Sequence, residues 1–404
     1  MNYCLALVLS FCFCQALSQN LITHPITQTI QSTTLKEPRE LLIYSPSTDK
    51  TSKVRYPVMY LLDGPSFFEA FTGMARYLSA CGKIPPVIIV GIANTNRVRD
   101  MTPTHAIHWS DGEKDEKALS TSGGGEAFTS FLEQELIPHI DSLYPTAPYR
   151  MMVGHSLAGL LALNTLLNHP KLFTAYVTID PTLWWDQRLM LKKASTVLAR
   201  MDYSGKKIFF ASANTLPEGR DTLGIEQDTA HSTIHVRDNL AFRQLLSTNK
   251  GNHLAFNWKY YPDDNHASVP FIAGYDALRT LFKGYELPKE LNDPELNAAF
   301  VSQHYQSVST LLGYPVLPPE STINLLGYEN LSTKRYQQAY DYFRTNVANY
   351  PQSFNVYDSL GDYYLAVGDT KQAAGTFRKA LSIKENVDTR KKLDALSRSG
   401  NHSN

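Results

Sequence analysis

Short apolar runs recur between residues 27 and 261 and predict the strands of a buried sheet. Residues 58–62 and 87–92 are apolar at nearly every position, which is typical of strands covered on both faces. Residues 67–78 and 125–144 instead carry apolar side chains at helical spacing. The predicted strands cover residues 27–34, 39–44, 57–62, 86–92, 149–154, 175–180, 207–212 and 254–261. Because strands and helices alternate, we expect an α/β fold with a mostly parallel central sheet between helical layers.

One predicted strand runs directly into a helix at Ser156. The strand reaches Gly154, and a helical pattern begins at Leu157 without a connecting loop. A serine at so tight a turn exposes its hydroxyl at the sheet edge, beside the N–H groups of the helix N-terminus. Ala158 occupies the motif position where glycine is usual, and Gly159 follows it. The pattern predicts a catalytic nucleophile at Ser156; a serine that only caps a buried helix is the alternative.

A different periodicity begins after residue 320. Three pairs of identical residues are separated by 34 positions, namely Leu326 and Leu360, Ala339 and Ala373, and Phe343 and Phe377. This is the period of the tetratricopeptide helix-turn-helix unit. We therefore expect tetratricopeptide-like repeats at 321–398, after a proline-containing linker at 285–320 and before a disordered tail at 399–404. Two such repeats rarely suffice alone, so they should pack on the first domain, on a second copy or on a partner protein.

The N-terminus resembles a secretory signal peptide. Its apolar run, residues 4–16, is too short to span a bilayer as a helix and is followed by a cleavage-like sequence near residue 18. We expect a signal peptide at 1–18, a folded domain at 19–284 and a periplasmic or secreted location; a buried N-terminal strand is the alternative. Three of the four cysteines lie in the signal segment, so its removal leaves Cys81 with no intramolecular disulfide partner.

Composition and charge narrow the range of partners. Lys plus Arg and Asp plus Glu number 38 each, so no global field favours nucleic acid or an anionic membrane. With 43% apolar residues the chain can bury a substantial core. We expect a small-molecule substrate, no membrane span, no metal and no cofactor.

Five motifs, taken together and in order, resemble the putative esterase family, an α/β-hydrolase family that includes esterase D-like enzymes, feruloyl esterases, mycolyltransferases and siderophore esterases. The motifs are Tyr60–Gly64, Gly91–Asp100, Gly154–Leu157, Asp180–Trp185 and His266–Pro270. The resemblance covers roughly residues 25–283 and is greatest to the enterobactin and salmochelin esterase-like branch. It implies an α/β-hydrolase domain that acts on esters.

The resemblance also implies how the ester would be hydrolysed. Ser156 would attack the carbonyl to form an acyl-enzyme, and His266, which follows the last predicted strand, would act as general base. One oxyanion donor would be the Leu157 N–H. The family places the second donor directly after Gly64, but that residue is Pro65, which has no N–H. Ser66 N–H is the expected substitute, with Gly64 N–H or a hydroxyl as alternatives.

The sequence leaves undecided which carboxylate orients the histidine. The loop after the strand at 207–212 offers four carboxylates, of which Glu218 is the prediction because it lies closest to the strand end. The others are Asp221, Glu226 and Asp228. Asp264, or a Ser-His dyad without an acid, remain alternatives. We further expect Arg99 to contact an anionic substrate, and Trp184 and Trp185 to form walls of its pocket.

Two other functions remain compatible with the sequence. A binding or scaffold protein could use the helical repeats while the serine turn is inactive, and an acyltransferase could use the same Ser-His machinery. The presence of both Ser156 and His266 favours a serine carboxylic ester hydrolase, for which siderophore-like or other small polar esters are the expected substrates.

Overall fold

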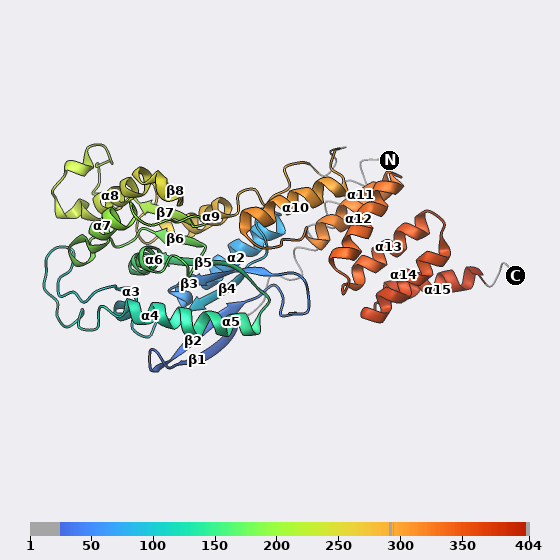
Figure 1. Ribbon diagram of the computed structural model, residues 1–404, viewed down its shortest axis with the longest axis horizontal. Helices are drawn as coiled ribbons and strands as arrows, with labels where there is room; N and C mark the ends of the chain where they lie inside the picture. The colour runs from blue at the N-terminus through green and yellow to red at the C-terminus, as the bar shows by residue number, and fades with distance from the viewer. Residues whose placement is uncertain (1–24, 291–292, 294, 401–404) are drawn as a thin grey trace. The chain divides into compact units, whose positions relative to one another are not determined.

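The computed structural model describes residues 25–290, 293 and 295–400. The predicted signal peptide at 1–18 therefore lies outside the described residues. One eight-stranded sheet has the order β1-β2-β4-β3-β5-β6-β7-β8 (Figure 1). Its strands are β1 (Ile26–Ser32), β2 (Glu37–Tyr44), β3 (Tyr56–Leu61), β4 (Ile88–Ile92), β5 (Thr146–His155), β6 (Ala175–Ile179), β7 (Lys207–Ala213) and β8 (Ala255–Tyr261).

Only the N-terminal edge of this sheet is antiparallel. β1 pairs with β2, and β2 pairs with β4, in antiparallel fashion, whereas β3 to β8 are all parallel to one another. The carboxyl ends of these six strands therefore meet at one edge, where an α/β sheet presents its functional loops. This is the α/β-hydrolase fold with a mostly parallel sheet, as the sequence predicts.

Helices cover both faces of the sheet. The helices and helical turns of this part are α2 (Gly64–Ala80), α3 (Arg97–Met101), α4 (Gly125–Phe131), η1 (Leu132–Leu136), α5 (Ile137–Leu143), α6 (Leu157–Asn168), α7 (Trp185–Val197), η2 (Ile225–Gln227), η3 (His231–Thr233), α8 (Ile234–Thr248), η4 (Lys250–Asn252) and α9 (Val269–Leu281). Tyr60 and Met152 pack in one cluster with Leu160 of α6. The next residues along those strands, Leu61 and Val153, instead lie around a small cavity with Phe71 of α2. Successive strand residues point to opposite faces, so α2 and α6 cover opposite faces of the sheet.

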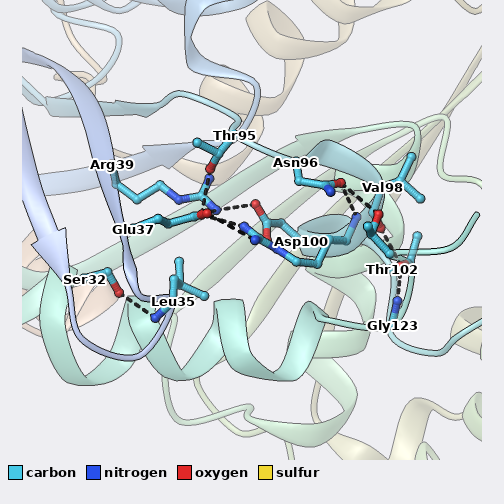
Figure 2. Close-up of polar contacts among 12 residues, drawn as sticks. Ser32, Leu35, Glu37, Arg39, Thr95, Asn96, Val98, Asp100, Thr102 and Gly123 are labelled. Carbon is cyan, nitrogen blue, oxygen red and sulfur yellow. Dashed lines mark hydrogen bonds and ion pairs between the residues drawn. The ribbon is translucent and has the colours of Figure 1, made fainter. Parts of the chain in front are cut away.

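The long segment between β4 and α4 is held to the sheet by a charged cluster (Figure 2). Arg39 of β2 and Asp100 of α3 are both completely buried and form an ion pair. Glu37 accepts from Arg39 at 2.5 Å, and Arg99 donates to the same Glu37 oxygen at 2.5 Å. Figure 2 shows these contacts together with Thr95, which donates to Glu37 at 2.8 Å. A buried charge is tolerated only when paired, so this cluster fixes the start of the segment rather than leaving it mobile.

Chain contacts divide the protein after Lys283 into two units, the second of which also includes residues 49–55. The second unit is helical, with α10 (Ala298–Leu312), α11 (Glu320–Ser332), α12 (Tyr336–Asn349), α13 (Phe354–Ala366), α14 (Thr370–Ile383) and α15 (Val387–Gly400). The segment expected to be a linker thus contains α10. The last helix extends to Gly400, into the segment expected to be a disordered tail, and residues 401–404 lie outside the description.

The 34-residue spacing corresponds to a repeated contact. A Cβ on Gly327 would lie 2.5 Å from the Phe343 ring, and one on Gly361 would lie 2.4 Å from the Phe377 ring. The helix pairs α11–α12 and α13–α14 therefore pack through the same glycine and phenylalanine positions, 34 residues apart. Their assignment as tetratricopeptide-like repeats stays a prediction. In the part of the chain that the structure describes, no helix is long and apolar enough to cross a bilayer.

Candidate active site

Ser156 occupies the single residue between β5 and α6. Its backbone is strained, with φ 61° and ψ −121°, as expected for a serine at a sharp strand-to-helix turn. A Cβ at Gly154 would meet the Ala158 carbonyl oxygen at 2.2 Å, so only glycine fits there. Ala158 itself is completely buried, and its methyl group is accommodated. The close approach in this turn therefore occurs at Gly154, which explains why alanine is tolerated at 158.

Strand register brings a carboxylate to the side of this serine. His155 pairs with Ile179 in the β5–β6 ladder, so the next residues, Ser156 and Asp180, leave the sheet side by side. Ser156 N–H donates to the Ile179 carbonyl at 3.0 Å. The hydroxyls of Ser156 and Thr182 share a hydrogen bond of 3.2 Å. The turn after β6 thus lies against the nucleophile.

The predicted base, His266, is hydrogen-bonded to Asp180. His266 Nδ1 lies 2.6 Å from Asp180 Oδ2, and the carboxylate side chain is 1% exposed. Asp180 Oδ1 accepts the Ala213 N–H at 2.9 Å. The histidine follows β8, as expected, so Ser156, Asp180 and His266 follow three strands of the parallel part of the sheet, β5, β6 and β8.

The prediction of Glu218 as the acid is corrected by this geometry. Glu218 is exposed in the segment after β7, five residues beyond the strand end. The other candidates are also engaged or exposed: Asp221 and Glu226 are exposed, Asp228 pairs with Arg220, and Asp264 accepts from Ser268 at 2.8 Å. The sequence-based prediction placed the acid in the loop after β7, whereas Asp180, the carboxylate that contacts His266, follows β6. The available signal was Asp180 itself, which directly follows a mainly apolar strand.

The electrostatics of the cluster keep Asp180 ionised and His155 neutral. Burial alone would raise the pKa of Asp180, but hydrogen bonds and positive potential from His235 and His266 outweigh it and hold that pKa well below its usual range. Burial, followed by repulsion from His266, lowers the pKa of His155 to about 4. The His155 and His266 rings are 4.5 Å apart. An ionised carboxylate beside the base is the arrangement that supports an imidazolium during catalysis.

A second ion pair braces the nucleophile turn from the β3 side. Asp63, which is 5% exposed, accepts from Arg97 at 2.8 and 2.9 Å and from Asn94 at 2.5 Å. Arg97 also donates to the His155 carbonyl at 3.2 Å, immediately before Ser156. One guanidinium therefore links the turn after β3 to the turn after β5. The sequence placed Arg97 in a family motif but gave no sign of this role.

Two helix N-termini supply the candidate oxyanion donors. Leu157 is the first residue of α6 and Gly64 the first residue of α2, and a first-turn N–H has no acceptor within its own helix. β3 and β5 are adjacent, so both helix starts lie at the same edge of the sheet. Ser66 N–H, by contrast, donates to the Asp63 carbonyl at 2.9 Å. The prediction of Ser66 as second donor is therefore not supported, and its alternative, Gly64, has the better position.

Of the three residues expected to contact the substrate, Trp184 is partly exposed and is neither held in an ion pair nor buried in the core. Arg99 is committed to Glu37 and Asp100, and its hydrogen bond lowers the pKa of Glu37 to about 2. Trp185 is 1% exposed and belongs to the core. The structure thus gives Arg99 and Trp185 structural partners in place of a substrate. Trp184 is partly buried and packs edge-on against Trp109, with ring centroids 6.4 Å apart.

A single His/Asp group could reach a common metal ion among the described residues. Asp180, His235 and His266 have candidate ligand atoms within 4.8 Å of one another. Their shortest separations, 2.6 and 2.9 Å from Asp180 Oδ2 to the two imidazoles, are hydrogen-bond lengths. The His266 contact is a direct hydrogen bond, whereas His235 Nε2 approaches the carboxylate without an aligned hydrogen bond.

Comparison with known proteins agrees with the fold. The "Putative esterase" family model matches residues 32–269, more than half of the chain. The ferri-bacillibactin esterase BesA of Bacillus subtilis is 32% identical over 192 residues, which cover 44% of this chain and 65% of BesA, slightly less than two thirds. The siderophore enterobactin esterase of Emericella nidulans is 26% identical over 262 residues, covering 58% of this chain and 84% of that protein.

A solved structure extends the similarity to most of the chain. An IroE-like serine hydrolase from Shewanella oneidensis superimposes with a TM-score of 0.69 at 32% identity, covering 80% of this chain and 99% of that structure. The chain therefore belongs to the putative esterase family and is an esterase of the serine hydrolase type.

Proposed function

We propose that the protein hydrolyses ester bonds of siderophores or chemically similar polar esters, through an acyl-enzyme on Ser156. The observation that carries this proposal is the contact between His266 Nδ1 and the buried Asp180 carboxylate, beside a serine held in a strained strand-to-helix turn. A neutral histidine whose Nδ1–H is fixed by a carboxylate presents Nε2 as a base.

In the first half of the reaction, Ser156 Oγ exchanges its Thr182 partner for His266 Nε2 and attacks the ester carbonyl. The serine proton moves to Nε2, and the oxyanion is stabilised by the N–H groups of Leu157 and Gly64. Collapse of the tetrahedral intermediate breaks the ester C–O bond, and the alcohol leaves with the proton from Nε2. Asp180 remains ionised and stabilises the imidazolium.

In the second half, water attacks the acyl-enzyme. His266 Nε2 removes the water proton, and a second oxyanion forms at the same two donors. Breakdown releases the carboxylic acid and returns the proton to Ser156 Oγ. The same residues therefore serve both steps, and the reaction balances with water as the only co-substrate.

The relatives support the choice of substrate class. BesA acts, by its name, on ferri-bacillibactin, and the Emericella nidulans relative on enterobactin. Trp184 and Trp109, which are partly buried and lie on segments leading from the sheet edge, offer aromatic surface for a ring-containing substrate.

The test combines active-site labelling with product analysis. Wild type and Ser156→Ala would be treated with a fluorophosphonate and analysed by mass spectrometry. They would then be incubated with bacillibactin, enterobactin and triacetylfusarinine C, each iron-free and ferric, and with a short-chain nitrophenyl ester. We expect labelling at Ser156 and hydrolysis that falls by about 10⁶-fold in Ser156→Ala, as when a serine nucleophile is removed.

Two results would contradict the proposal at different levels. Undiminished turnover by folded Ser156→Ala would remove the assigned mechanism. Rapid turnover of the nitrophenyl ester with no cleavage of any siderophore would leave the mechanism intact and overturn the substrate class.

A further inference from the structure

The buried Asp180 carboxylate contacts a second histidine besides the base. His235 Nε2 lies 2.9 Å from Asp180 Oδ2, the same oxygen that His266 Nδ1 approaches at 2.6 Å. The His235 side chain is only 16% exposed, and its ring is nearly perpendicular to that of His266, with centroids 5.2 Å apart. In this structure the contact is a close ion-pair approach, and His235 Nε2 makes no aligned hydrogen bond. We propose that His235 is a positioning residue for ester hydrolysis, whose Nε2–H turns toward Asp180 Oδ2 and holds this oxygen toward His266. This inference rests on the proposed function.

The helix that carries His235 packs on the turn after β6, which contains Asp180 and Pro181 and is called the acid turn below. His235 and Asn239 lie four residues apart in α8 and so share one helix face. Asn239 is completely buried, and its Nδ2 donates to the Pro181 carbonyl at 3.1 Å. Two consecutive turns of the same face therefore contact two consecutive residues of the acid turn. A histidine that merely filled space would not require this second, directional contact.

Asp180 needs such support because its own backbone is strained. Its φ is 44°, in the left-handed region that non-glycine residues rarely adopt. The Ala213 N–H holds Oδ1, which leaves the direction of Oδ2 to be set by its two imidazole neighbours. With His235 removed, only His266 would hold Oδ2, and a base that must change its own protonation state is a poor anchor. The acid would then be free to turn away from His266 during part of each cycle.

The arrangement specifies the tautomer of both rings. The His266 Nδ1–H donates to Asp180, which leaves His266 Nε2 free to act as the base, whereas the proposed donation from His235 uses its Nε2–H. A glutamine at 235 places an amide N–H close to the position of the imidazole Nε2 and can make the same donation. An alanine cannot. The pair of substitutions therefore separates hydrogen-bond donation from simple packing.

The experiment compares His235→Ala, His235→Gln and the control His169→Ala in the full-length protein. His169 contacts Glu126 at 2.8 Å and follows the far end of α6, so the control removes a histidine–carboxylate contact away from the site. Steady-state kcat and KM on a short-chain nitrophenyl ester, the fluorophosphonate labelling rate of Ser156 and the thermal midpoint would be measured for each.

We expect His235→Ala to lower kcat and the labelling rate by about 10- to 100-fold, the usual range for residues that orient a catalytic group. KM should change by less than about twofold, because His235 does not touch the substrate in this proposal. His235→Gln should recover to within about threefold of wild type, and His169→Ala should match wild type.

Four outcomes overturn the inference. They are an unchanged kcat in His235→Ala, an equal loss in folded His235→Gln, a loss confined to KM, and inactivation of wild type by a divalent-metal chelator, which would make the trio a metal site. A wild-type protein that folds but is not labelled at Ser156 would instead overturn the proposed function, so the two failures are distinguishable.

Discussion

The turn after β5 and the turn after β6 carry Ser156 and Asp180 at the same sheet edge, but these two residues are held in different ways. Ser156 is fixed by its own neighbours in sequence, since Gly154 lets the chain pass the Ala158 carbonyl and α6 begins at Leu157. Asp180 is held by groups from α8, from β7 and from the loop after β8. The role of a locally encoded turn can be predicted from adjacent residues, whereas the role of Asp180 depends on groups that distant segments bring to it.

The most direct test of this comparison is to substitute Asp180 and, in parallel, Glu218, the residue that the sequence predicted as the acid. Asp180→Asn should lower kcat by about 10⁴-fold, because an amide favours the wrong tautomer of His266. Glu218→Gln should leave kcat within about twofold, since Glu218 is exposed after β7. Steady-state kinetics on a nitrophenyl ester would measure both. A large loss in Glu218→Gln with a small one in Asp180→Asn would reverse the assignment.

The nucleophile turn should be broken by a single methyl group. Gly154→Ala places a Cβ 2.2 Å from the Ala158 carbonyl oxygen, a contact that only backbone movement can relieve. We expect the free energy of unfolding to fall by about 1–3 kcal/mol. The labelling rate of Ser156 should fall by about 10²-fold or more, because small misplacements of reacting groups are costly. Urea unfolding and fluorophosphonate kinetics would test this, and a variant with wild-type values would show that the turn is not locally determined.

Breaking the link that Arg97 makes between the turns after β3 and β5 should have a smaller effect on kcat. Arg97→Gln removes the ion pair with Asp63 and the donation to the His155 carbonyl. We expect kcat to fall by about tenfold, through a less ordered oxyanion site. Arg55→Gln, which removes a guanidinium whose contacts are with backbone carbonyls of residues 50–54, is the matched control. Equal kinetics for the two variants would exclude a role for Arg97 in positioning.

Substitution of His155 should have the smallest effect, which should appear in the pH dependence of the free energy of unfolding rather than in kcat. Burial lowers its pKa to about 4 from 6.5, so below pH 6.5 the unfolded chain binds the proton before the folded chain does. The free energy of unfolding is therefore unaffected by His155 titration above pH 6.5. It decreases as the pH falls below 6.5, by roughly 2 kcal/mol at pH 5. Urea unfolding at pH 7 and pH 5 should show a smaller loss in His155→Gln than in wild type. Identical losses would mean that His155 titrates normally in the folded protein.

Much of the fold and part of the site could be predicted from the sequence. Apolar runs predicted the sheet, and the tight turn at Ser156 and the loop position of His266 predicted a nucleophile and a base at positions that the structure places at one edge. Glu218, Ser66 and Arg99 were chosen by position along the chain, and the structure does not support them. His266 pairs with Asp180 in place of Glu218, and Arg99 pairs with Glu37, because distant segments meet in space. The Ser66 N–H is instead occupied locally, by the Asp63 carbonyl three residues earlier.

The sequence by itself determined the α/β architecture and the serine turn, because both depend on the period of apolar residues and on residues adjacent in the chain. Only the tertiary structure decided that Asp180 is the carboxylate beside His266 and that His235 shares it. The physical reason lies in the strand register. His155 pairs with Ile179, which places Asp180 beside Ser156, while α8 and the loop after β8 return from distant positions to the same buried oxygen. Such a convergence of donors leaves no periodic trace in the sequence.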